Sequence, residues 1–271
     1  MLVSAFLVSS LTLATLQHGR RPHQDPDQEK IAERVSIEAR DGLMINAEYY
    51  QASPDPRTPL LVLYHQARSG RAEYRPIAPR LKELGYDCLA VDLRSGQASG
   101  GVPNLTAKVA RDHGQNPTYL DALPDIEDSL AWARANHPQA KIVAWGSSYS
   151  ASLVLVLAAT SPKLLDGALA FAPGEYFTAL GKPATWVRDT AQKIHCPVFL
   201  TASRSEQGEW QPIFDAIPDG PKKSFVPEAE GAHGSRALWD ETEGNEEYWK
   251  AVEAFLKEQF PPPAATDAPA K

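Results

Sequence analysis

Short apolar runs alternate along most of this chain with longer segments that have helical spacing. The apolar runs are residues 60–64, 86–91, 141–145, 167–172 and 197–202, with a weaker one at 222–226. A continuous apolar run of this length is typical of a strand buried on both faces, as in a parallel sheet covered by helices. The alternation therefore predicts an α/β fold with a mostly parallel, twisted sheet and helices on both faces.

The segments between these runs complete the predicted architecture. Helical spacing is found at residues 74–84, 119–136, 148–161, 185–193, 211–217 and 245–260. Ahead of the first apolar run, residues 34–39 and 43–50 alternate in polarity around Asp41-Gly42, which predicts a β-hairpin at an antiparallel edge. With the hairpin, the sheet has about eight strands, and we expect one domain over residues 31–260.

Composition narrows the classes of partner and cofactor. Acidic residues outnumber basic ones, 34 to 27, and the net charge is −7. Nucleic acids and anionic membranes attract clustered Lys and Arg, so neither is an expected partner. Two cysteines are too few for a disulfide scaffold or a Cys-rich zinc module, and no metal-ligand spacing is found. We expect no metal and no cofactor, and the sequence does not indicate an oligomeric state.

The two ends of the chain differ from its middle. Residues 1–16, MLVSAFLVSSLTLATL, are apolar but too short to span a bilayer of roughly 30 Å, so we expect no stable membrane span. They resemble the apolar part of a signal peptide, although no basic residue precedes them. We expect a secreted or periplasmic protein, with a cytoplasmic one as the alternative. Residues 17–30 are a predicted linker, and the Pro/Ala-rich residues 261–271 a predicted disordered tail.

One serine motif, Gly-Ser-Ser-Tyr-Ser, lies between the run at 141–145 and a predicted helix. A strand that turns sharply into a helix presents a serine hydroxyl near free N–H groups, which favour developing negative charge. So tight a turn needs small residues two positions before and after the serine. Ser148 meets this requirement with Gly146 and Ser150, whereas Ser147 has aromatic residues at both places. Ser148 is therefore the candidate nucleophile, and a serine that only caps the helix is the alternative.

A serine hydroxyl becomes a good nucleophile when a histidine takes its proton. Of the seven histidines, His233 lies between glycine-rich neighbours, after the last predicted strand and before the final helix. Flanking glycines let a loop approach another segment closely. His233 is the candidate base, with a purely structural loop histidine as the alternative. We expect His65, after the run at 60–64, to hold its own loop.

These motifs resemble the α/β-hydrolase superfamily from about residue 34 to 260. The branch most similar is that of dienelactone-hydrolase-like serine esterases, on the segment LVLYHQARSGRAEYRPIAPRLKELGYDCLAVDLRSG. The family order is nucleophile, acid, histidine. The resemblance implies an α/β-hydrolase fold, and the short interval between residues 172 and 197 implies that no large lid is present. It also implies that the strands beginning with Cys88 and Cys196 are not neighbours, so we expect no disulfide.

The resemblance also implies roles for further residues. The acid that orients the histidine is Glu206, nine positions after Pro197, with Glu209 as a competitor. The oxyanion-hole amides are those of Tyr149 and Ala67, with Gln66 as the neighbouring option for the second.

We also expect residues 93–118 to form a long loop that shapes the pocket. Asp92 and Arg94, at the start of this loop, are expected to tie it to the sheet edge. The leading hypothesis is a serine hydrolase that cleaves small or medium carboxylic esters through an acyl-enzyme on Ser148, with His233 and Glu206. Dienelactone hydrolases have a cysteine nucleophile, so serine esterase chemistry is the expectation. An amide or peptide hydrolase with the same triad, and a catalytically silent binding protein, are the alternatives.

Overall fold

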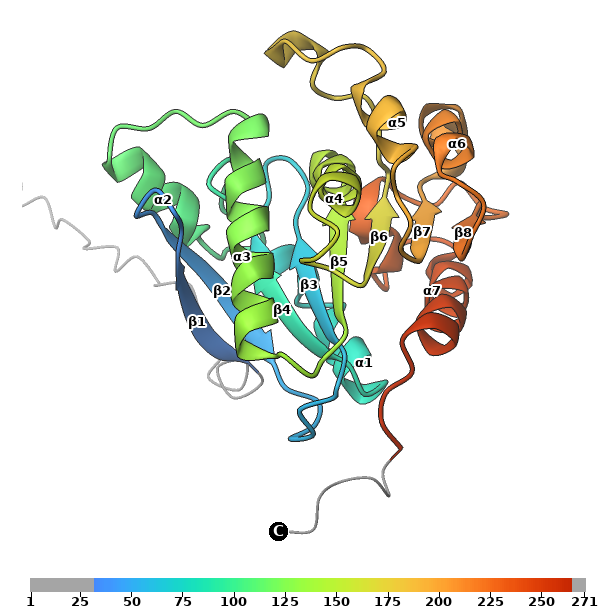
Figure 1. Cartoon of the computed structure of the whole chain (residues 1–271), viewed down its shortest axis with the longest axis horizontal. Coiled ribbons are helices and arrows are strands. Elements are labelled where there is room, and N and C mark those ends of the chain that lie inside the picture. Colours follow the sequence, from blue (N-terminus) through green and yellow to red (C-terminus); the bar gives the residue numbers. More distant parts are fainter. Residues whose placement is uncertain (1–31, 265–271) are drawn as a thin grey trace, which may run out of the picture.

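The computed structural model describes residues 32–264. The predicted signal peptide, the linker and residues 265–271 of the predicted tail lie outside the described residues. The strands are β1 (Glu33–Glu38), β2 (Met44–Tyr50), β3 (Leu60–Tyr64), β4 (Asp87–Val91), β5 (Ile142–Ser147), β6 (Gly167–Phe171), β7 (Val198–Thr201) and β8 (Lys222–Phe225). They form one eight-stranded sheet in the order β1-β2-β4-β3-β5-β6-β7-β8 (Figure 1). The pairs β1–β2 and β2–β4 are antiparallel and all others are parallel, which confirms the predicted sheet.

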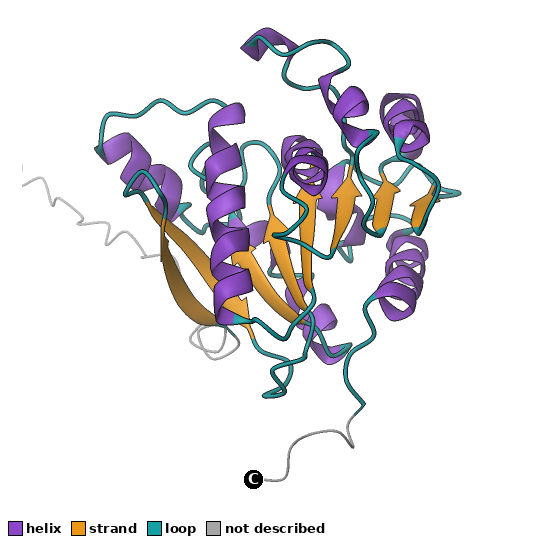
Figure 2. Cartoon of the chain, viewed as in Figure 1, coloured by secondary structure: helices purple, strands orange, loops and turns teal. Residues whose placement is uncertain are grey.

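Helices cover both faces of this sheet (Figure 2). The α-helices are α1 (Ala78–Glu83), α2 (Leu105–Asp112), α3 (Leu123–Asn136), α4 (Tyr149–Thr160), α5 (Trp186–Ala191), α6 (Gln207–Ala216) and α7 (Asn245–Gln259). Short 3-10 helices are η2 (Arg71–Tyr74), η3 (Leu120–Ala122), η4 (Thr178–Leu180), η5 (Arg204–Glu206) and η6 (Gly234–Leu238). Successive residues of β3 face opposite sides of the sheet. Leu60 and Val62 pack in the core with α3 and α4, and Leu61 and Leu63 pack in the core with α1 and α7. Strands buried on both faces are thus apolar throughout.

The opening hairpin forms where the alternating polarity predicts it. Gly42 has φ +80° in the turn, and its N–H donates to the Ala39 carbonyl at 2.8 Å. A residue with a side chain rarely adopts this φ, so glycine suits the position.

The segment 93–118 differs from the prediction, because it contains the helix α2 and is not a continuous loop. The Asn104 side chain accepts the Ala107 N–H at 2.8 Å and caps this helix. An asparagine cap was the local signal for the helix. Asp92 binds the Leu105 N–H at 2.8 Å, and Arg94 binds Asp125, so both residues tie the segment down as expected.

Between β6 and β7 the chain forms η4 and α5, two short helices where the sequence predicted one, and no large lid. Cys88 and Cys196 are free thiols, and β3, β5 and β6 separate β4 from β7. Within residues 32–264, no helix is both long and apolar enough to cross a membrane.

Candidate active site

Ser148 lies at the sharp turn between β5 and α4, called here the Ser148 turn (residues 146–150). Its backbone has φ 61° and ψ −123°, a conformation that costs a residue other than glycine about 1–3 kcal/mol. Its N–H donates to the Phe171 carbonyl at 2.7 Å, which helps to hold the turn. Strain of this kind at a serine ahead of a helix N-terminus places the hydroxyl close to free N–H groups.

The two small residues that the turn was predicted to need have different roles. A Cβ on Gly146 would lie 2.4 Å from the backbone N of Ala151, so no side chain can be accommodated there. Ser150 is fully buried, and its hydroxyl donates to the Tyr64 carbonyl at 2.8 Å and accepts the Ser147 N–H at 2.9 Å. The serine at this place therefore ties the turn to β3.

His233 is hydrogen-bonded to a carboxylate that follows β7. Its Nδ1 lies 2.5 Å from Glu206 Oε1, while Glu206 Oε2 accepts the Ser203 hydroxyl at 2.5 Å. Burial raises the pKa of Glu206, but the bonds from His233 and Ser203 outweigh it and hold that pKa below its usual value. An ionised carboxylate only accepts hydrogen bonds, so Nδ1 carries the proton and Nε2 is left free to accept one.

Glu209, the competing candidate, lies further along in α6. Its side chain is exposed, and no hydrogen bond joins it to His233 in the described structure. The geometry favours Glu206.

The loop of His233 (residues 230–239, the His233 loop) is held directly against the Ser148 turn. The Ser235 N–H donates to the Ser147 hydroxyl at 2.9 Å, and the Trp145 indole donates to the Ser235 hydroxyl at 2.9 Å. A Cβ on Gly234 would lie 2.4 Å from Ser147 Oγ, so glycine allows this close approach. Ser148 directly follows Ser147, and His233 directly precedes Gly234. The structure thus brings His233 and Ser148 together at the carboxyl end of β5.

The loop after β3 (residues 65–70, the 65–70 loop) contains the two residues considered for the second amide. The Gln66 N–H donates to Glu73 Oε2 at 2.9 Å and is therefore occupied. No acceptor for the Ala67 N–H is found among residues 32–264. Tyr149 is the first residue of α4, so its N–H has no partner within the helix. Ala67 and Tyr149 are the amides left available to a ligand.

His65 is fully buried beneath this loop, as a structural residue would be. Its Nδ1 lies 2.8 Å from the Gln66 carbonyl, and its Nε2 accepts the Leu93 N–H at 3.0 Å. Burial lowers the pKa of His65, which keeps the ring neutral. Both nitrogens are occupied, so this histidine holds the loop, as predicted.

Tyr176 is a residue beside Ser148 that sequence reasoning missed. Its hydroxyl donates to the Ala172 carbonyl at 2.8 Å, and its side chain remains 39 % exposed. Burial of the hydroxyl and the nearby charge of Glu206 raise the pKa of Tyr176 to about 12, while the Ser148 hydroxyl acts in the opposite direction. The residue follows the carboxyl end of β6, where side chains that bind ligands collect in parallel sheets.

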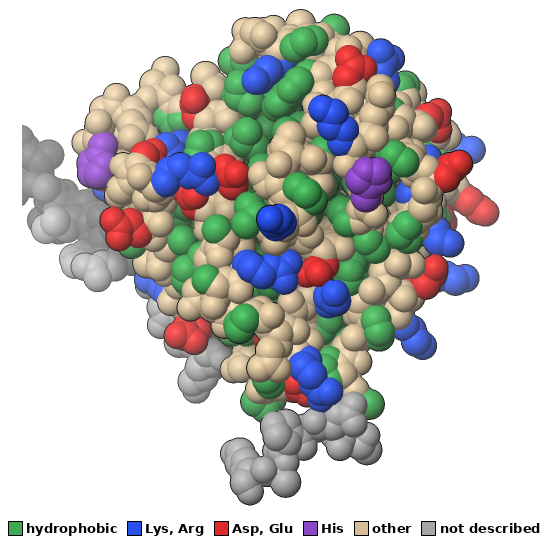
Figure 3. Space-filling model, in the orientation of Figure 1, with side chains coloured by type: hydrophobic (Ala, Val, Ile, Leu, Met, Phe, Trp, Pro, Cys, Tyr) green, Lys and Arg blue, Asp and Glu red, His purple; other side chains and the backbone are tan. Residues whose placement is uncertain are grey.

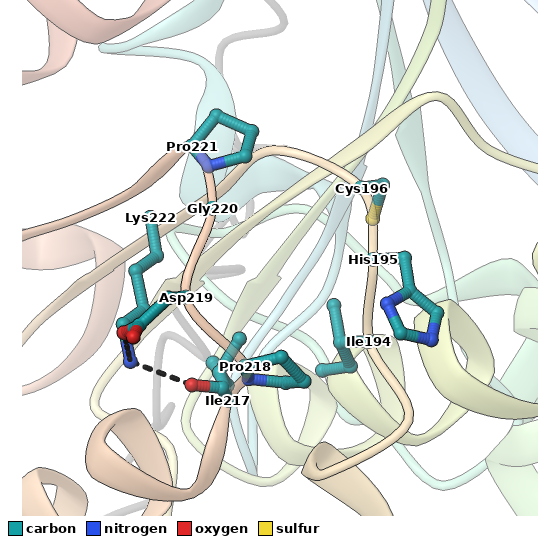
Figure 4. Close-up of a pocket in the computed structure, with 9 residues that line it drawn as sticks. All are labelled: Ile194, His195, Cys196, Ile217, Pro218, Asp219, Gly220, Pro221 and Lys222. Carbon is teal, nitrogen blue, oxygen red and sulfur yellow. Dashed lines mark hydrogen bonds and ion pairs between the residues drawn. The ribbon is translucent and has the colours of Figure 1, made fainter.

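Other parts of the surface are less suited to chemistry. A hollow of about 110 Å³ is lined by residues just before β7 and around the start of β8, at the opposite end of these strands from Glu206 (Figure 4). Lys222 lies on its wall and donates to the Ile217 carbonyl at 2.6 Å. The face in Figure 3 shows acidic and basic side chains interspersed. No group of three metal-ligating side chains is found among residues 32–264.

Comparisons with known proteins agree with this architecture. A model of the alpha/beta hydrolase fold family matches residues 59–194, about half of the chain. The chain belongs to the alpha/beta hydrolase fold family. This confirms the resemblance and the fold predicted from the sequence. A search of curated proteins finds no match.

Solved structures of several members of this fold are similar to the chain. The esterase Pf2001 of Pyrococcus furiosus is 20 % identical, with a TM-score of 0.66 over 88 % of this chain and 96 % of that one. The esterase Est1E of Butyrivibrio proteoclasticus, solved with ferulic acid, is 17 % identical, with a TM-score of 0.64 over 83 % and 98 %. A dienelactone hydrolase of Anabaena variabilis is 13 % identical, with a TM-score of 0.63 over 84 % and 97 %.

Proposed function

We propose that this protein is a serine hydrolase that cleaves carboxylic esters of small or medium size through an acyl-enzyme on Ser148. The observation that carries the proposal is the bond from His233 to an ionised Glu206, in a loop fixed on the residue before Ser148. An imidazole held in this way has its free nitrogen available to take a proton. The similarity of the fold to Pf2001 and Est1E supports an ester as the substrate.

The proposed reaction has two halves. The Ser148 oxygen attacks the ester carbonyl carbon while His233 Nε2 takes the hydroxyl proton, and the C–O bond to the alcohol breaks as His233 returns that proton to the leaving oxygen. A water molecule then attacks the acyl-enzyme with His233 again as base, releasing the acid and restoring the serine. Glu206 orients the ring and stabilises its charged form.

The negative charge of each tetrahedral intermediate needs donors. We assign these to the N–H groups of Ala67 and Tyr149, since the Gln66 N–H is bound to Glu73. Tyr149 lies at the N-terminus of α4, where the helix dipole also favours negative charge.

A fluorophosphonate probe tests the proposal. The probe should label the wild-type protein on Ser148, as shown by peptide mapping, and Ser148→Ala should lose both labelling and turnover of short p-nitrophenyl esters. Residual catalysis should be of order 10³–10⁴ over water. Ser224→Ala, which alters an exposed serine on the edge strand β8, is the control and should behave as wild type.

Two results would contradict the proposal. Failure to label a folded wild-type sample would indicate a catalytically silent binding protein. Labelling combined with a preference for aminoacyl amides over esters would indicate an amide hydrolase.

A further inference from the structure

Glu73 is a buried carboxyl group that the proposed mechanism does not use. It lies in η2, directly after the 65–70 loop, and is 1 % exposed. Its Oε2 accepts the Gln66 N–H at 2.9 Å, whereas its Oε1 is buried without a hydrogen-bond partner in the described structure. Burying a polar atom without a partner destabilises the folded protein, so a purely structural role accounts poorly for this residue type here.

Glu73 lies where three parts of the candidate site meet. It binds the 65–70 loop through Gln66, and the hydroxyl of Ser147 in the Ser148 turn is close enough to lower its pKa. Its backbone carbonyl accepts the Trp239 indole N–H at 3.0 Å, which adds the His233 loop. The hydroxyl of Tyr74, the next residue in the chain, also lies 3.2 Å from the Ser235 hydroxyl of that loop.

The environment of Glu73 favours its neutral form. Burial raises its pKa, and this effect outweighs the Gln66 N–H, the nearby hydroxyls of Ser147 and Ser69 and the charge of Arg236, all of which lower it. Whether protonated or ionised, the carboxyl has an oxygen that can accept the Gln66 N–H.

We propose that Glu73 is a positioning residue for the oxyanion hole, which fixes the 65–70 loop through the Gln66 N–H so that the Ala67 N–H stays directed at the reacting carbonyl. This inference rests on the proposed function. Fixing the Gln66 amide limits the rotation of the next peptide plane, whose N–H is that of Ala67. An oxyanion donor must lie close to its ideal place, because a displacement of about 1 Å can cost about 10²-fold in rate.

Substitutions that keep or remove the acceptor test this role. Glu73→Gln keeps a carbonyl oxygen for the Gln66 N–H and should keep kcat close to that of the wild type. Glu73→Met has a similar size but no such acceptor, and its kcat should fall about 10²-fold with KM little changed. If Glu73→Met does not fold, Glu73→Asn replaces it, since its shorter amide cannot reach Gln66 and should give the same split between kcat and KM.

A control separates positioning from general destabilisation. Tyr49→Phe removes the bond from Tyr49 to Asp87, 2.5 Å long and at the opposite end of the parallel strands, and should lower Tm without changing kcat. A second measurement is the infrared carbonyl stretch of an acyl-enzyme formed from a slowly hydrolysed ester. In Glu73→Met the stretch should move to higher wavenumber, because the carbonyl has lost a hydrogen bond, and in Glu73→Gln it should stay in place.

Several results would overturn the inference. These are wild-type kcat in Glu73→Met, equal losses in Glu73→Gln and Glu73→Met, or an unchanged carbonyl stretch. Each differs from a failure of the proposed function, in which the wild-type protein itself is neither labelled nor active on esters.

Discussion

Replacing Glu206 with glutamine would change which nitrogen of His233 carries the proton. The Ser203 hydroxyl and N–H both donate to Glu206 Oε2, at 2.5 Å and 3.3 Å. In Glu206→Gln the amide oxygen would keep these donors, so the NH₂ group would face His233 Nδ1. That nitrogen would then have to accept a hydrogen bond, and the proton would move to Nε2. With its Nε2 protonated, a neutral His233 cannot act as the base for Ser148.

Two effects set how far kcat should fall in Glu206→Gln. Losing a charge-assisted hydrogen bond costs about 1.5–3 kcal/mol, or roughly ten-fold to a hundred-fold in rate. The wrong tautomer can bring the loss to about 10⁴-fold in a buried triad. Here the side chains of His233 and Glu206 are 42 % and 27 % exposed, so water can partly compensate. We therefore expect kcat to fall by about 10²–10⁴-fold, with KM little changed.

Steady-state hydrolysis of a p-nitrophenyl ester measures this effect, with circular dichroism to confirm that the variant is folded. Glu209→Gln is the matched control, since Glu209 is exposed and close in sequence, and it should keep wild-type kcat. The reasoning is refuted if Glu206→Gln loses less than about ten-fold or if both variants lose equally.

Two further substitutions test the structure around the site. Gly146→Ala should cost more than about 4 kcal/mol of stability, because its Cβ would lie 2.4 Å from the Ala151 backbone N; wild-type urea unfolding would contradict this. Glu48→Gln should cost about 3 kcal/mol at pH 7, since it removes a carboxylate that pairs with both Arg75 and buried Arg71, although Arg71 keeps its ion pair with Asp92. Burial raises the pKa of Glu48 but the two arginines lower it overall, so this stability is present at neutral pH and lost as pH falls below the usual carboxyl range. Urea unfolding from pH 7 to pH 3 should show the wild type and Glu48→Gln converging, and a constant difference would argue against the ion pairs as the cause.

Most of the sheet was predictable because strands buried on both faces leave a strong apolar signal. The apolar signal of β8 (Lys222–Phe225) was weaker because β8 is an edge strand with exposed side chains. Helix α2 was missed because the glycines and asparagines around it suggested a loop, although the Asn104 side chain caps it. Polarity over a short window does not distinguish a capped surface helix from a loop.

In the candidate site, local sequence patterns pointed to some candidate residues and left others open. The spacing around Ser148 and the glycines beside His233 selected both from the chain alone. The choice between Glu206 and Glu209 depended on where α6 begins, which sets the direction of each side chain. The choice between Gln66 and Ala67 depended on Glu73, whose contact with the Gln66 N–H has no sequence signature.

The bond between Ser203 and Glu206 has a consequence for how the acid comes to face His233. These residues form a capping box, in which each side chain binds the other's backbone at the start of η5. The contacts that initiate the helix also aim the carboxylate, over an interval of three residues. Orientation of the acid is thus encoded locally, and an aspartate at 206, shorter by one methylene, would have to give up either the cap or the imidazole.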